Sequence, residues 1–138
     1  KFATSKDLVI WEKLPGVVFG TNRYTACPAI HYSNEHYYLL YLERRAPRWF
    51  FETYIARSEN LREWEYSPRN PVLSPREIDD GINASDPDLI EYNGQTLLYY
   101  AVGDQRTWMN IKRALYDGPM TDFLEAWFPP GLEKLAAH

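Results

Sequence analysis

Residues 85–102 decide the fold and read Ser-Asp-Pro-Asp-Leu-Ile-Glu-Tyr-Asn-Gly-Gln-Thr-Leu-Leu-Tyr-Tyr-Ala-Val. Two runs within this stretch are typical of β-strands, residues 88–92 and 95–102, and Asn93-Gly94 separates them. Asparagine and glycine accept the positive φ angles of a two-residue turn, so the pattern predicts a β-hairpin.

Two carboxylic acids stand at the start of this hairpin. Asp86 and Asp88 flank Pro87. Proline cannot donate a hydrogen bond to a strand ladder and therefore marks the beginning or the edge of a strand. We therefore expect both acids at an end of the sheet, where ligands commonly meet strands.

The chain nearly repeats this hairpin 59 residues earlier, where residues 27–42 read Cys-Pro-Ala-Ile-His-Tyr-Ser-Asn-Glu-His-Tyr-Tyr-Leu-Leu-Tyr-Leu. The matching pairs are Pro28 with Pro87, Asn34 with Asn93, Leu39 with Leu98, and Tyr41 with Tyr100. A second repeat relates residues 3–12 to residues 56–65 at a spacing of 53. An insertion around residues 76–82 accounts for the difference between the spacings of 53 and 59 residues. A repeat of this length with four short strands is typical of a propeller blade.

The predicted fold class is all-β, built from β-propeller blades of four antiparallel strands. Trp11 and Trp64 recur with the repeat and are predicted to pack between blades. The predicted organisation is the second half of a blade at residues 1–18, a full blade at 26–74, a full blade at 85–128, and an added tail at 129–138. About two and a half blades cannot close a ring, so we expect either a longer parent chain or a homodimer that completes the propeller.

Composition excludes several classes of function. The net charge is −4, whereas a nucleic-acid surface needs clustered Lys and Arg. The sequence contains no apolar run that spans a bilayer. A single cysteine and three scattered histidines predict no zinc site, and we expect neither a metal nor a cofactor.

Aromatic residues make up 16% of the chain. They fill the core of a small β-fold, or they stack on sugars, because Trp and Tyr present flat apolar faces with polar rims. Trp49 and Trp108 stand in matching loops before the third strands of their units. These two are the best candidates for sugar stacking.

At the level of motifs, the chain resembles the five-bladed β-propeller glycosidases, the glycoside hydrolase family 43 and 32 type. The resemblance covers about residues 1–118 and rests on Ser-Lys-Asp-Leu-Val-Ile-Trp-Glu, Ala-Arg-Ser-Glu-Asn-Leu-Arg-Glu-Trp, Ala-Cys-Pro-Ala-Ile-His-Tyr and Ser-Asp-Pro-Asp-Leu-Ile-Glu-Tyr-Asn-Gly. It implies a five-bladed fold that is incomplete in one chain, and a central pocket lined by acids.

The resemblance also implies roles for individual residues. Glycoside hydrolysis needs one carboxyl group to protonate the leaving oxygen and a second to activate water or attack the sugar. Asp86 matches the Asp-Pro position of the family, which implies a base or an acid that orients the catalytic groups. The family's general acid lies two residues before a proline, but Ala26 occupies that position before Pro28, and the chain departs from the pattern there.

Further residues are predicted to bind substrate around Asp86. Arginine donates in a planar fork that suits carboxylates and sugar hydroxyls, and loop polar groups rim pockets. These candidates are Arg23, Arg48, Arg106, Asp88, Asn83 and Asp104. Glu43 and Asp104 follow the second strands of their units, where they reach the axis or form surface ion pairs.

The sequence thus favours a carbohydrate-active protein, a glycoside hydrolase or a fragment of one. Two alternatives remain open, a non-catalytic sugar-binding propeller, which Ala26 favours, and a structural fragment that self-associates through exposed blade faces.

Overall fold

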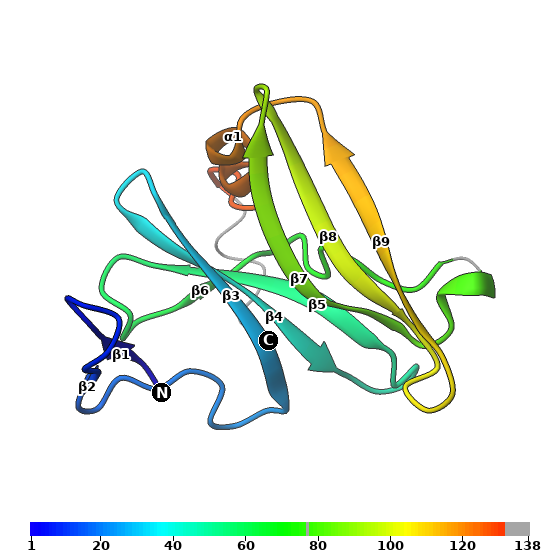
Figure 1. Cartoon of the computed structure of the whole chain (residues 1–138), viewed down its shortest axis with the longest axis horizontal. Helices are drawn as coiled ribbons and strands as arrows, with labels where there is room; N and C mark the ends of the chain where they lie inside the picture. The colour runs from blue at the N-terminus through cyan, green and yellow to red at the C-terminus, as the bar shows by residue number, and fades with distance from the viewer. Residues whose placement is uncertain (77, 132–138) are drawn as a thin grey trace.

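The computed structural model describes residues 1–76 and 78–131, and these residues form a nearly all-β fold (Figure 1). Of the predicted tail, residues 132–138 lie outside the described residues. No described helix has the length and apolar character needed to cross a membrane. The elements in chain order are β1 (Ala3–Thr4), β2 (Glu12–Lys13), β3 (Thr25–Ser33), β4 (His36–Arg44), β5 (Phe51–Ser58), β6 (Glu65–Tyr66), the 3-10 turn η1 (Ile78–Asp80), β7 (Asn83–Tyr92), β8 (Gln95–Gly103), β9 (Met109–Tyr116) and α1 (Met120–Glu125).

Antiparallel pairing of sequential strands builds two units. The first unit is β3-β4-β5-β6 and the second is β7-β8-β9, while β1 and β2 form a separate two-stranded ribbon. The hairpin predicted at Asn93-Gly94 is present between β7 and β8, with Tyr92 opposite Gln95. Each strand predicted between residues 26 and 74 is also found, so local pattern was sufficient to predict these strands.

One pairing differs from the antiparallel expectation. The starts of β5 and β7 pair in parallel, Phe51 with Asn83 and Glu52 with Ala84, which joins both units into one seven-stranded sheet. The amide of Phe51 donates to the carbonyl of Ile82 at 2.9 Å. The insertion before β7 thus returns the chain alongside β5, and sequence periodicity carries no signal for such a contact.

The sequence repeat is also a repeat of backbone conformation. A bulge interrupts the β3–β4 register between Ala26 and Ala29, and its counterpart interrupts β7–β8 between Ser85 and Asp88. The second repeat behaves in the same way, because Leu8 and Leu61 have φ angles of 62° and 63°. Matching residues therefore occupy matching places in successive units.

The main core lies between the two units. Fully buried side chains of β4 and β5 meet apolar residues of β7 and β8, and α1 closes the core at one end. The buried members are Tyr38, Leu40, Ile55, Leu89, Leu98, Leu124 and Phe128. Burial of apolar surface on this scale is the main source of stability in a β-fold of this size.

The opposite face of the first unit is covered as well. Leu39, Tyr41, Tyr54 and Ala56 pack beneath Phe2, Phe19, Trp64 and Tyr66. Strand β4 is therefore apolar and buried on both faces, as a strand between two layers should be.

The packing prediction is right for one tryptophan and wrong for the other. Trp64 stacks on Phe2 with ring centroids 5.8 Å apart. Trp11 is 57% exposed. Trp64 is covered by Phe2 and Phe19 of the N-terminal segment, and the repeat pattern does not distinguish it from the exposed Trp11.

The second unit differs from a four-stranded blade because the helix α1 follows β9 in place of a fourth strand. The face of its sheet that is turned away from the first unit is not covered by any other described segment. Large apolar side chains are exposed there, namely Ile90, Tyr92, Tyr99, Ile111 and Leu115. We refer to these five residues as the open face.

Candidate functional site

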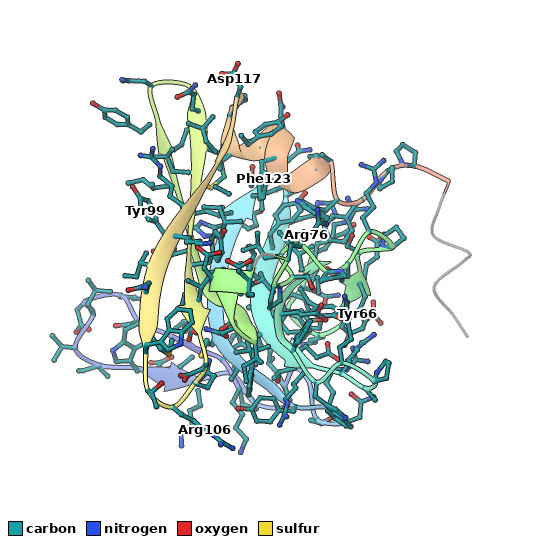
Figure 2. The ribbon with its side chains drawn as sticks, turned by 90° about the vertical axis from the view of Figure 1, so that its right-hand side faces the viewer. Tyr66, Arg76, Tyr99, Arg106, Asp117 and Phe123 are labelled. Carbon is teal, nitrogen blue, oxygen red and sulfur yellow. The ribbon has the colours of Figure 1, made fainter. Side chains whose placement is uncertain are left out.

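The predicted site residues gather at one end of the sheet. We call this end the mouth, and define it as the end where β3, β5, β7 and β9 begin and β4 and β8 finish. Figure 2 places Arg106 at the mouth and Asp117 at the opposite end of the molecule. Antiparallel meanders with a parallel β5–β7 contact bring the strand starts of both units together here.

Asp86 and Cys27 occupy the two matching bulges at the mouth. Asp86 has a φ angle of 54° and Cys27 of 48°, and each residue precedes a proline. Left-handed backbone at residues other than glycine is strained, and such positions concentrate at functional sites. Both side chains are exposed, so each bulge presents a reactive group to solvent.

The thiol of Cys27 hydrogen-bonds to the carboxylate of Asp86. Partial burial, this hydrogen bond and the negative charge of Asp86 together raise the pKa of Cys27 to about 11. Cys27 is therefore a neutral thiol at physiological pH and donates to Asp86. Sequence reasoning missed this pair, although the repeat already aligned Cys27 with Asp86 at the spacing of 59.

A buried polar pair supports Asp86 from beneath. The Ser85 hydroxyl lies 2.7 Å from Asp86 Oδ2 and 2.6 Å from Asn83 Oδ1. Asn83 is fully buried, and its amide donates to the carbonyl of Ala101 at 3.1 Å. Asn83 thus lies behind Asp86 in the structure, where it orients Ser85.

Asp104 organises the loop between β8 and β9. Its Oδ1 accepts the backbone N–H groups of Arg106, Thr107 and Trp108 at 2.9, 2.8 and 3.1 Å. The Thr107 hydroxyl and these N–H groups hold the pKa of Asp104 below its usual range. The carboxylate of Asp104 therefore fixes the loop that presents Arg106 and Trp108.

The loop between β4 and β5 carries the second tryptophan. Trp49 is 52% exposed and has a φ angle of 59°. The Arg44 Nε donates to the Trp49 carbonyl at 2.9 Å, and the Arg44 guanidinium lies 5.5 Å from the Trp49 ring. An exposed ring held from one side is suited to stacking on a flat ligand.

Two buried carboxylates lie behind this loop. Glu43 and Glu52 are directly opposite one another on β4 and β5. Arg48 Nη2 lies 2.9 Å from Glu52 Oε1, and Arg23 Nη1 lies 3.6 Å from Glu43 Oε2. Glu43 is thus a buried ion-pair partner and not part of a surface ion pair. An acid ending an apolar strand before an arginine-rich loop was the available signal for it.

Asp88 lies beyond the bulge and contacts β3. Its Oδ1 is 3.9 Å from His31 Nε2, while the Asp88 side chain is 80% exposed. Burial lowers the pKa of His31, and the charge of Asp88 opposes this effect. This contact links the first strands of the two units.

The predicted site residues thus form three groups at the mouth, with Asp88 further along β7. Asn83 and Asp86 are joined through Ser85, and Asp104 holds Arg106 and Trp108. Arg23 and Arg48 pair with buried glutamates, and Trp49 is in the same loop as Arg48. Across residues 1–76 and 78–131, no three His, Cys, Asp or Glu side chains are arranged to hold a metal ion.

Comparisons with known proteins identify similar folds. No family model matches the chain, and no curated protein matches it. A solved structure named "Glycoside hydrolase" aligns at 22% identity with a TM-score of 0.70, over 86% of this chain and 35% of that chain. A second solved structure, named as a BT0996 RGII complex, aligns with the same identity, TM-score and coverage.

These likenesses concern the fold. The chain spans about a third of the length of the two solved structures. Its nearly all-β arrangement is therefore glycosidase-like.

Proposed function

We propose that this chain is part of a carbohydrate-active protein of the five-bladed β-propeller glycosidase type, and that Asp86 acts on a glycosidic bond at the mouth. The observation that carries the proposal is the exposed Asp86 carboxylate on a left-handed bulge, with Ser85 bound to one of its oxygens. Strain at a polar residue at a sheet end is typical of catalytic positions.

The chemistry assigns Asp86 one of two carboxyl roles. Cleavage needs an acid that protonates the leaving oxygen and a carboxylate that activates water, attacks the sugar or orients the acid. Ser85 bound to one oxygen of Asp86 suits the second of these roles. The matching bulge offers the Cys27 thiol and Ala26 in place of an acid. We therefore assign Asp86 as base or orienting acid, and assign the general acid to a residue outside these two bulges.

The surrounding groups bind the sugar. Trp49 and Trp108 supply apolar faces from separate loops, and Arg106 supplies a planar donor beside Trp108. Sugars combine apolar ring faces with equatorial hydroxyls, so a site of rings and planar donors suits them.

The test is a turnover assay of Asp86→Asn against a panel of 4-nitrophenyl glycosides. Loss of a catalytic acid or base lowers the rate by at least about a hundredfold, and sugar affinity should change little. Asp122→Asn is the matched control, because Asp122 lies in α1 away from the mouth. Unchanged turnover in Asp86→Asn would overturn the assignment.

A second candidate is a sugar-binding protein without catalysis. The absence of an acid at Ala26 and Cys27, two adjacent positions of the matching bulge, favours it. In that case no glycoside in the panel is cleaved by any form of the protein. Trp49→Ala would still weaken sugar affinity, since stacking provides the binding energy.

The blade organisation is part of the proposal. Residues 1–18, 26–74 and 85–128 serve as half, full and full blade, and the open face is the surface at which a further blade packs, including one from a second copy. Large exposed apolar patches mark interaction sites. Light scattering tests the homodimer, with an expected mass twice that of the 16.3 kDa chain. Leu115→Lys should return the dimer to a monomer, and a monomeric wild-type chain would overturn this part.

A further inference from the structure

A pocket that does not include Asp86 lies on the face of the first unit that is turned away from the second unit. It has a volume of about 300 Å³, and its lining residues are Arg23, Tyr41, Arg45, Tyr54, Tyr66, Ser67, Pro68 and Asn70. Figure 2 shows Tyr66 on the opposite side of the molecule from Tyr99 of the open face. We refer to this cavity as the arginine pocket.

Two guanidinium groups frame the arginine pocket. Arg23 lies 4.5 Å from the centre of the Tyr66 ring, and Arg45 lies 5.0 Å from that of Tyr54. Both arginines also contact Glu43, Arg45 through Nε at 2.5 Å and Arg23 through Nη1 at 3.6 Å. Rings and carboxylate together hold the guanidinium planes in place before any ligand arrives.

The pocket has an excess of positive charge. Arg23 and Arg45 share the single carboxylate of Glu43. The neighbouring Glu52 is engaged by Arg48 at 2.9 Å and by the Ser74 hydroxyl at 2.5 Å. One positive charge of the pair is therefore uncompensated, and the pocket favours an anion.

The Tyr41 hydroxyl and Glu43 Oε2 are buried polar atoms near the arginines, and Glu43 Oε2 forms an ion pair with Arg23 at 3.6 Å. Within the described part of the chain, neither the Tyr41 hydroxyl nor Glu43 Oε2 makes a hydrogen bond. Burial raises the pKa of Tyr41, and the charges that act on its hydroxyl include Glu43, Arg23 and Arg45. A buried hydroxyl without a hydrogen-bond partner lowers stability, so the fold retains an unused donor at Tyr41 beside the arginines.

Asn70 and Ser67 of the lining are already hydrogen-bonded within the protein. The Asn70 amide group pairs with both backbone groups of Ile55, at 2.8 and 2.9 Å. The Ser67 hydroxyl donates to the carbonyl of Trp127 at 2.6 Å. The groups left to recognise a ligand are therefore the two guanidiniums and the hydroxyls of Tyr41 and Tyr66.

These groups define the chemistry of the ligand. A carboxylate accepts hydrogen bonds from guanidiniums and hydroxyls, so the polar groups of the pocket match a carboxylate ligand. A volume of about 300 Å³ lies at the small end of ligand pockets and suits a single sugar ring. We propose that the arginine pocket binds the carboxylate of an acidic monosaccharide unit, an inference whose sugar part rests on the proposed function above.

The test uses three probes in isothermal titration calorimetry at low salt. D-glucuronate should bind at least tenfold more tightly than D-glucose, which has the same ring without the carboxylate, and added salt should weaken the binding. Acetate should bind more weakly than glucuronate, because it lacks the sugar ring that fills the pocket. Equal affinity for acetate and glucuronate would overturn the sugar assignment, and equal affinity for glucose and glucuronate would overturn the pocket as an anion site.

Variants locate the binding in the arginine pocket. Arg45→Gln should weaken glucuronate affinity at least tenfold, while Arg113→Gln, an exposed arginine on β9, should leave it unchanged. Arg45→Lys keeps the charge beside Glu43 and guards against misfolding, and should bind glucuronate with intermediate affinity because it loses the planar fork. Wild-type affinity in both Arg45 variants would overturn the inference.

A final variant separates this inference from the proposed function. Asp86→Asn should leave glucuronate affinity within twofold of wild type, since Asp86 does not line the arginine pocket. If Asp86→Asn abolishes binding and Arg45→Gln does not, glucuronate binds beside Asp86 and not in the arginine pocket. That result would overturn this inference and leave the proposed function standing.

Discussion

Cys27 and Asp86 form a hydrogen bond between two strand bulges that correspond to one another in the repeat. The carboxylate of Asp86 in the second unit is therefore paired with Cys27, the residue at the equivalent position of the first unit. At the mouth, the second unit therefore contributes a carboxylate and the first unit contributes a neutral thiol.

Removing the charge at Asp86 should make Cys27 more reactive. The pKa of Cys27 is raised to about 11 by burial and by Asp86, so Asp86→Asn should lower it while burial keeps it above its ordinary value. Only the thiolate reacts, and alkylation by iodoacetamide at pH 8 should accelerate several-fold. Asp88→Asn removes a charge two residues away and serves as the control. An identical pH profile in wild type and Asp86→Asn would contradict the hydrogen bond.

Glu125 should anchor α1 to the first unit in a pH-dependent manner. Burial raises the pKa of Glu125, but bonds from Tyr38 and Asn34 and the charge of Arg57 outweigh it, so the folded-state pKa is lowered. A lowered pKa contributes stability above the unfolded value of about 4.5, and this contribution is lost as pH falls through the folded pKa.

Glu125→Gln should therefore cost about 1 kcal/mol at pH 7, because the Glu125 carboxylate is one-third exposed and its ion pair is partly screened. Urea unfolding at pH 7 and pH 3 measures the difference, which should shrink at pH 3. Glu63→Gln, an exposed glutamate whose side chain makes no hydrogen bond or ion pair within the described residues, should be neutral at both pH values. A cost that is independent of pH would contradict the ionic anchor.

Exchanging the residues at equivalent positions of the two hairpin turns should change stability in opposite directions. Gly94 has a φ angle of 75°, and its counterpart in the first unit, Glu35, has a φ angle of 61°. Left-handed backbone costs a residue with a Cβ about 1–2 kcal/mol relative to glycine. Glu35→Gly should therefore stabilise the protein and Gly94→Glu should destabilise it by a comparable amount. Urea midpoints that move the same way in both variants would show that turn strain does not control these hairpins.

Leu124 should be the main contribution of α1 to the core. Its side chain is fully buried between the two units, and Leu124→Ala should cost about 3 kcal/mol, as for other large-to-small changes in cores. Leu115→Ala on the open face should cost less than about 0.5 kcal/mol, because that side chain is 52% exposed. Thermal unfolding of both variants makes the comparison, and equal losses would mean that α1 is not docked as described.

Local sequence signals were sufficient to predict most of the strands. The Asn93-Gly94 turn and the alternation beside it fixed one hairpin, and the repeat extended that prediction to β3 and β4. The parallel β5–β7 contact was not predictable, because it depends on how the insertion returns to the sheet. Trp11 was misassigned because the repeat pattern identifies equivalent positions and says nothing of whether a covering layer exists.

The site was predictable as a region and less so as a set of contacts. Sequence position placed Asp86, Trp49 and Trp108 at strand starts and in loops, which the topology then gathers at the mouth. The role of Asp104 as a loop organiser required the hydrogen bonds to its own backbone. The arginine pocket was missed because Arg45 and Tyr66 are distant in sequence and meet only through packing.

The open face has a consequence for the addition of further units. Its residues Tyr99 and Ile90 correspond in the repeat to Leu40 and His31, which face the second unit. The open face of the second unit is therefore equivalent to the face of the first unit that the second unit covers. An architecture of this kind has no intrinsic stopping point. A further unit with the same sequence pattern would meet a ready-made apolar surface on which to stack.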